Sequence, residues 1–532
     1  MAIAGSITKA KKWYLESERA RIGFGLLGCC IAFAFLNALY NFRFPTQTFE
    51  SWSFLTSAIA SIPNAPRIGL LLIIGLGTAY FGRSPSAPLA TGTKVVLWAT
   101  VGICAYSYSL YAYNWWAGQF HLLDRIIVLG LGIATIRWPN LVGLFAFSVL
   151  VSAQQWAVVL SVDNELTNRA LFLDLLVCFQ VVVLLRSFLR IPDFLTFAVP
   201  TGLLCIHYAW AGLSKVLVSP RGWEWLVDNS LGNLAINGTL SGWTALWDVA
   251  SSTVVANYID GLGFVALLFA IGIELFAPLS LLSKRLFILS ALARVGLHLG
   301  IFLTTGDLFW NWVVFGLLLI VAAWKTTEEE RRAFSWRAVG IILLLVVCLT
   351  PFTRARNLGW FDTAMVGEFD LIVIGESGQH YVVYDAWAEP FDLAMVHGAF
   401  TDLVNGPTLT ASFGTTRNYD DFVALEAMRS PEEALTYIAE HGRNRYSERS
   451  ARRFDLFVRR MLSADNLERR QSTLASFLSF VQPPHHIWNY PNGEPLWDSQ
   501  ERPVRAELYY SLFWHDSDIH LLTRHLARTV HL

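Results

Sequence analysis

The sequence Phe194-Leu-Thr-Phe-Ala-Val-Pro-Thr-Gly-Leu-Leu-Cys-Ile-His-Tyr-Ala-Trp-Ala-Gly-Leu213 decides the fold class of this chain. It contains no aspartate, glutamate, lysine or arginine. It is also long enough to cross the hydrocarbon core of a bilayer, which needs about 20 mostly apolar residues. The stretch therefore predicts a membrane-spanning helix.

Similar apolar stretches recur along the first two thirds of the chain, and 54% of all residues are hydrophobic. Only 15% are charged, whereas an average soluble domain has about 25%. These observations predict a mainly α fold, built on a polytopic helical membrane domain of about eleven spans. The expected spans are 24–40, 68–81, 95–116, 126–136, 141–160, 170–185, 194–213, 262–282, 286–303, 309–324 and 338–349.

The predicted spans divide the chain into a cytoplasmic N-terminal segment (1–22), a transmembrane domain (23–353) and an extracytoplasmic soluble domain (354–532). With the N-terminus inside, sixteen lysines and arginines fall on the inner side and six in the outer loops before residue 354. This asymmetry fits the positive-inside rule. An odd number of spans then places the C-terminal domain outside, so we expect a multi-pass protein of the cell membrane.

The C-terminal domain is expected to be a soluble α+β domain with mostly helical structure. Residues 369–374 and 380–384 are β-rich runs joined by a glycine-containing loop, which predicts a β-hairpin. Apolar periodicity predicts helices at 420–441, 450–462, 467–481 and 504–528.

Nucleic acid and metal ions are not expected as partners. A net charge of −1 gives no reason to expect a polyanion. The six cysteines lie in apolar segments without metal-ligand spacing. The pair His485-His486 follows two prolines and has no carboxylate at ligand spacing, so we interpret it as a polar loop.

Charged and polar residues inside the apolar region mark the candidate site, because a charge at membrane depth costs roughly 2.5–3.5 kcal/mol. His207 and Lys215 lie on one helix, and Glu274, Arg294 and His298 lie on two later spans. Glu274 is a natural ion-pair partner for Arg294. Each feature has a structural alternative: Lys215 as an interfacial lysine that extends to water, and the carboxylate–guanidinium pair as a brace between two helices.

The segment Tyr208-Ala-Trp-Ala-Gly-Leu-Ser-Lys215, followed by Trp223, resembles a motif of the HTTM (horizontally transferred transmembrane domain) family. That family includes vitamin K-dependent γ-glutamyl carboxylase. The later segment His298-Leu-Gly-Ile-Phe-Leu-Thr-Thr-Gly-Asp-Leu-Phe-Trp310, with Glu274 on the preceding helix, fits the same pattern. The resemblance extends over roughly the middle of the chain, from Asp124 to Trp324.

The resemblance implies a carboxylase- or oxygenase-like membrane enzyme. Lys215 would be the base that deprotonates a quinol such as reduced vitamin K, because a neutral amine in an apolar pocket can accept a proton. Membrane lipid, a quinone, and an extracytoplasmic protein or peptide substrate are the implied partners. The expected catalytic residues are Lys215, Glu274, Arg294 and His298, and the expected substrate-binding residues are His207, Tyr208, Gly212, Trp223 and Trp310.

The chain departs from the carboxylase in one informative place. Residues 184–192 contain no histidine, whereas the carboxylase has one there that helps to handle the substrate carbanion. We therefore expect Lys215 to act as a base on a quinol-like or other lipophilic substrate. We do not extend the carboxylation of protein glutamate to this chain. The non-enzymatic alternatives are a transporter, a maturation or immunity factor that binds through the same cavity, and a scaffold whose outer domain binds a partner.

Overall fold

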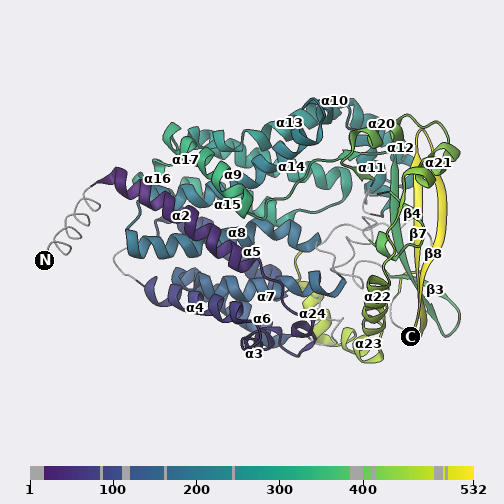
Figure 1. Cartoon of the computed structure of the whole chain (residues 1–532), viewed down its shortest axis with the longest axis horizontal. Coiled ribbons are helices and arrows are strands. Elements are labelled where there is room, and N and C mark those ends of the chain that lie inside the picture. Colours follow the sequence, from purple (N-terminus) through teal and green to yellow (C-terminus); the bar gives the residue numbers. More distant parts are fainter. Residues whose placement is uncertain are drawn as a thin grey trace.

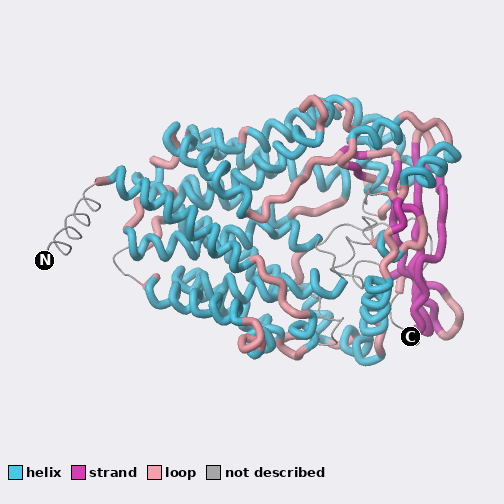
Figure 2. The backbone as a smooth tube through the Cα atoms, viewed as in Figure 1, coloured by secondary structure: helices cyan, strands magenta, loops and turns pink. Residues whose placement is uncertain are grey.

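A bundle of helices carries a layer of strands at one end (Figure 2). The start of α2 and the strands lie at opposite ends of this bundle (Figure 1). The chain is thus mainly helical with a β-containing C-terminal region, as the sequence predicts. This computed structural model describes residues 17–83, 88–110, 120–160, 164–242, 246–383, 400–409, 414–484, 495–497 and 501–532.

Within the described residues, each predicted span except 262–282 coincides with a helix or with part of one. Within the described residues, α2, α8 from Ala170, α9 and α14 are long and apolar enough to cross a membrane, and the bent pair α12–α13 would make a fifth span. The count of about eleven spans stays a prediction, because other apolar helices are shorter. The helices of the bundle are α2 (Glu18–Tyr40), α3 (Phe54–Ala60), α4 (Pro66–Phe81), α5 (Thr91–Leu110), α6 (Leu122–Arg137), α7 (Val142–Leu160), α8 (Asn164–Leu189), α9 (Asp193–Val218), α10 (Glu224–Val227), α11 (Leu231–Leu240), α12 (Val249–Gly261), α13 (Gly263–Leu275), α14 (Lys284–Thr305), α15 (Trp310–Trp324), α16 (Glu328–Arg331) and α17 (Trp336–Leu349).

Helix α9, which contains the opening stretch, lies inside the bundle. Its apolar window is 94% buried, against 28% for α2 and 22% for α14. The outer helices instead expose large apolar side chains such as Phe24, Leu27 and Leu289, which is typical of a surface that contacts lipid. Polar residues on α9 are therefore shielded from lipid by other helices.

The prediction of one continuous span over 262–282 is wrong. Helix α13 ends at Leu275, and a 3-10 helix, η4 (Ala277–Leu282), follows it. Pro278 lies at the start of η4, where its missing N–H costs no helical hydrogen bond. The axes of α12 and α13 also differ by 62°. Glu274 consequently lies in the last turn of a half-length helix rather than in the middle of a span.

The prediction of a helix over 504–528 is also wrong. This segment forms two antiparallel strands, β7 (Pro503–His515) and β8 (Ile519–His531). They extend the predicted hairpin of β2 (Met365–Gly375) and β3 (His380–Val383), which is confirmed. The sheet order is β3-β2-β7-β8.

The rest of the C-terminal region consists of short strands and helices, of which α22 contacts both α7 of the bundle and β8 of the sheet. The helix predicted at 420–441 is interrupted before Pro431, and the one at 467–481 is interrupted at Ser472. One hydrophobic cluster extends from Phe145 in α7 to Trp514 in β7, so the soluble region packs directly on the helical bundle. Its remaining elements are β1 (Phe361–Asp362), β4 (Pro407–Thr408), β5 (Thr415–Thr416), β6 (Arg443–Asn444), α20 (Tyr419–Glu426), α21 (Pro431–His441), α22 (Glu448–Met461), α23 (Ala464–Arg470) and α24 (Thr473–Val481).

Candidate functional site

Lys215 and Glu274 form a buried ion pair between α9 and α13. The Lys215 Nζ donates to Glu274 Oε2 at 2.7 Å and to Oε1 at 2.9 Å. Each side chain is only 9% exposed. The ring of Trp225 covers the ammonium group, with its centroid 5.3 Å from Nζ. Lys215 is therefore held inside the protein and does not extend to water, as an interfacial lysine would.

Gly212 allows the two helices of this pair to approach closely. A Cβ atom at this position would lie 2.9 Å from both the Glu274 Cβ and the Leu275 backbone nitrogen. Only glycine fits without a shift of α13, because contacts shorter than 3.0 Å are essentially never made by a Cβ atom. Gly212 thus contributes to the site by setting the helix separation rather than by contacting a substrate.

The expected pairing of Glu274 with Arg294 is wrong, since Glu274 pairs with Lys215. The Arg294 guanidinium instead lies over the ring of Tyr208, 4.7 Å from its centroid. Its Nη2 donates to Ser280 Oγ at 3.5 Å. Nε and Nη1 are buried and have no hydrogen-bond partner among the described residues. Because a buried unsatisfied donor is costly, these two nitrogens are candidates for ligand contact.

His298 lies on the same face of α14 as Arg294 and completes a polar cluster with Tyr208. The Tyr208 hydroxyl is 3.0 Å from His298 Nε2. The imidazole also packs against the rings of Phe309 and Trp312, with centroids 5.4 and 5.2 Å away. Its Nδ1 has no hydrogen-bond partner in the described part of the chain. The cluster therefore combines unsatisfied polar atoms with flat aromatic surfaces.

His207 belongs to a different buried network on the neighbouring face of α9. Its Nε2 lies 3.0 Å from Asp174 Oδ2. Asp174, on α8, also accepts from the Arg354 guanidinium at 2.5 Å and from the Arg354 backbone N–H at 2.7 Å. This network fixes the chain after α17 against α8 and α9, so the structure separates His207 from Lys215.

The two expected tryptophans are not part of the polar cluster. Trp223 is 56% exposed, and Trp310 packs edge-on against Tyr106. The aromatic residues that contact the polar groups are their neighbours Trp225 and Trp312. The sequence shows both as part of tryptophan-rich stretches, but it does not indicate which member of each stretch faces inward.

Asp362 of β1 is a buried acidic group of the C-terminal region that is close enough to Lys215 to be affected by its charge. It accepts from Asn229 Nδ2 at 2.9 Å and is only 3% exposed. Burial raises the pKa of its carboxyl to about 7, although the Asn229 hydrogen bond and the charge of Lys215 act in the opposite direction. A proton on Asp362 therefore equilibrates near neutral pH.

The described residues contain no group of three or more His, Cys, Asp or Glu side chains that could hold a metal ion. His485-His486 lies outside the described residues. Searches of protein-family models, curated proteins and solved structures find no match to this chain.

Proposed function

We propose that this chain is a membrane enzyme in which Lys215 acts as a base on a quinol-like or other lipophilic substrate. The observation that carries the proposal is the buried pair in which Nζ of Lys215 contacts both oxygens of Glu274. A lysine inside a membrane domain costs free energy unless it is paired. A pair of a buried base and a buried acid at hydrogen-bond distance is a typical arrangement for proton transfer.

The pair can provide a neutral amine without a net change of charge. Transfer of one ammonium proton to the Glu274 carboxylate leaves Lys215 uncharged, and the amine can then accept a proton from a substrate hydroxyl. The resulting ammonium group lies under the Trp225 ring, where a cation–π contact stabilises it. Glu274 thus holds the proton that Lys215 gives up, and Lys215 acts as the base.

The neighbouring cluster has the chemistry to hold an aromatic ligand that carries oxygen atoms. Nε and Nη1 of Arg294 can donate to a ligand oxygen, and Nδ1 of His298 can exchange a hydrogen bond with it. Tyr208 and Trp312 offer ring faces beside these atoms. A bound quinol would supply an acidic hydroxyl and two electrons to this site.

The HTTM resemblance and the N-in, C-out orientation belong to the same proposal. The start of α2 and the sheet lie at opposite ends of the bundle (Figure 1), which supports an N-terminus and a C-terminal domain on different sides of the membrane. Glu18 of α2 also pairs with Arg332 beside α16, as expected if both lie at the inner face. Of the chemistry that the carboxylase resemblance implies, only the use of a lysine base is proposed for this chain.

The test compares Lys215→Met and Lys215→Arg in isolated membranes, with a reduced short-chain naphthoquinone as the probe and dissolved oxygen as the acceptor of its two electrons. Arginine keeps the positive charge for Glu274 but cannot become a neutral base. We expect both variants to lower the rate of quinol consumption by roughly 10²–10⁴-fold, while Lys215→Arg accumulates to the normal level. The matched control is Lys325→Arg, because Lys325 is exposed.

Each outcome of this comparison has a defined meaning. Full activity in Lys215→Arg excludes Lys215 as the base. Failure of both variants to accumulate, with normal accumulation of the control, indicates that the ion pair only braces α9 against α13. That second result would favour the non-enzymatic alternative, in which the membrane domain binds a partner without chemistry.

A further inference from the structure

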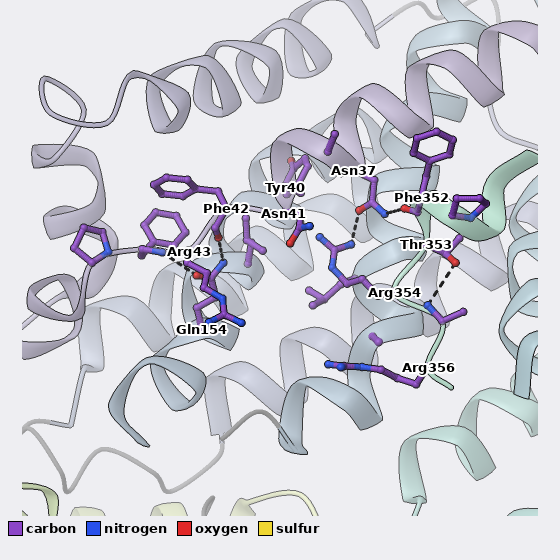
Figure 3. A pocket seen from close by; sticks show the side chains of 18 of the residues that line it. Asn37, Tyr40, Asn41, Phe42, Arg43, Gln154, Phe352, Thr353, Arg354 and Arg356 are labelled. Carbon is purple, nitrogen blue, oxygen red and sulfur yellow. Dashed lines mark hydrogen bonds between the residues drawn. The ribbon is translucent and has the colours of Figure 1, made fainter. Parts of the chain in front are cut away.

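A cavity of about 990 Å³ lies between the bundle and the C-terminal region. It is formed by the end of α2 and the chain after it, the end of α17 and the chain after it, and parts of α7, α8 and α22. Its volume is near the upper end of the range for sites that bind small molecules, about 300–1,000 Å³. Figure 3 shows that the labelled lining residues come from segments far apart in the sequence.

The lining of this cavity carries a strong excess of positive charge. Among the described residues that form it there is no aspartate or glutamate. It includes five arginines, from three different segments: Arg43, Arg354, Arg356, Arg449 and Arg453. Arginine is enriched where a protein binds phosphate or carboxylate, because its planar fork matches their oxygen atoms.

One of these arginines, Arg354, is held in place by hydrogen bonds to neighbouring side chains. Arg354 Nη1 donates to Asn37 Oδ1 at 2.5 Å, as Figure 3 shows. The same nitrogen donates to Asp174 Oδ1, also at 2.5 Å. Asp174 is completely buried. Asp174 therefore offsets the charge of Arg354 and holds its guanidinium in one orientation at the cavity wall, which is the preorganisation that a binding site needs.

The helix α22 brings two further arginines to the same wall. Arg449 and Arg453 are four residues apart on this helix, so their side chains lie on one face. Arg452, between them, points away from the cavity lining and pairs with Glu448 on the surface.

We propose that this cavity binds an anion with two or more phosphate charges. A phosphate monoester carries about −1.5 to −2 at neutral pH, whereas a carboxylate carries a single charge. Several arginines in the lining of one cavity therefore match a diphosphate or a phosphate-bearing headgroup better than a lone carboxylate. The remaining lining is partly apolar, with Phe42, Phe44 and Leu150, which leaves room for an attached apolar chain. The inference is independent of the role of Lys215, which does not line this cavity.

The ligand test uses the purified full chain in detergent, with titration calorimetry and thermal unfolding at constant ionic strength. The probes are inorganic pyrophosphate, dihexanoyl phosphatidic acid, dihexanoyl phosphatidylcholine and citrate. We expect saturable binding and a higher unfolding temperature with phosphate-bearing anions. Binding of pyrophosphate indicates that free phosphate suffices, and binding of phosphatidic acid alone indicates a lipid source. No saturable binding of either anion overturns the proposal, as does equal binding of citrate or phosphatidylcholine.

The residue test uses two double variants on or beside the same helix. Arg449→Gln with Arg453→Gln is expected to weaken binding of the best probe at least about tenfold. Arg445→Gln with Arg452→Gln is the matched control, because both arginines are exposed and outside the lining. Equal effects of the two double variants overturn the assignment of the site. If the first double variant does not fold, Arg43→Gln takes its place, with the same expected direction.

Discussion

Asp362 is a carboxyl group whose protonation links the soluble region to the membrane domain. It is buried beside Asn229, and its Oδ1 has no hydrogen-bond partner among the described residues. Its backbone N–H donates to the Asn229 side chain at 2.7 Å. Ionisation therefore places an incompletely compensated charge at the junction of β1 and the segment before α11.

The raised pKa of Asp362 predicts that the free energy of unfolding decreases as the pH rises. The ordinary value is 3.8 and the folded value is about 7, so the folded state binds the proton more tightly than the unfolded state. The contribution of the Asp362 proton to the free energy of unfolding is complete below about pH 4. It is lost as the pH rises through 7, and the loss is at most about 4 kcal/mol. Thermal unfolding of the purified protein between pH 5 and 8 should show this loss, and Asp362→Asn should reduce it. An identical pH profile in the variant would contradict the assignment.

The candidate site could be predicted from the sequence only in part. Lys215, Glu274, Arg294 and His298 stand out because charged or polar groups are rare in apolar segments. Their pairing could not be predicted, because it depends on the end of α13 at Leu275 and on the close approach at Gly212. The arginine-lined cavity was missed, since its residues come from segments that only the tertiary fold brings together.

At the scale of elements, the contact between α9 and α13 is the feature that forms the site. Gly212→Ala adds a Cβ atom 2.9 Å from the Leu275 backbone, whereas Gly272→Ala on α13 meets nothing within 4 Å. We expect Gly272→Ala to be neutral or slightly stabilising, because alanine favours a helix over glycine by roughly 1 kcal/mol. Gly212→Ala should destabilise by about 1–3 kcal/mol through overpacking. Thermal unfolding in detergent measures both, and equal effects would show that α13 does not pack closely here.

The C-terminal hairpin shows why one element was predicted as the wrong type. Residues 521–530 are rich in leucine and arginine, which favour a helix locally. In the structure, β7 instead buries Ala506, Leu508 and Tyr510 with a period of two, against the neighbouring strand β2. The turn at Asp516–Asp518 separates the two strands. In the sequence, these turn residues indicate a strand pair less strongly than the composition of 521–530 indicates a helix. Pairing with a strand more than 100 residues earlier therefore overrides local propensity.

At the scale of the whole molecule, the membrane domain and the soluble region form one packed body. Their shared hydrophobic cluster extends from α7 to β7, and Arg354 joins the connecting chain to α8 through Asp174. Neither Lys215 nor Glu274 lines the arginine-lined cavity, so the two sites are separate. The apolar composition predicts the membrane domain, whereas the packing of the sheet onto its end depends on contacts between segments far apart in sequence.

The central claim is that the cluster of Tyr208, Arg294 and His298 holds a lipophilic ligand that carries oxygen atoms on a ring. Mass spectrometry of solvent extracts from the purified protein tests it most directly. His298→Phe removes both ring nitrogens but keeps a flat aromatic side chain, and His380→Phe is the control because His380 is exposed. We predict a near-stoichiometric quinone-like or phenol-like molecule in the wild type and the control, and a reduced amount in His298→Phe. Extracts with only bulk phospholipids, or with equal amounts of such a molecule from all three proteins, would contradict the account.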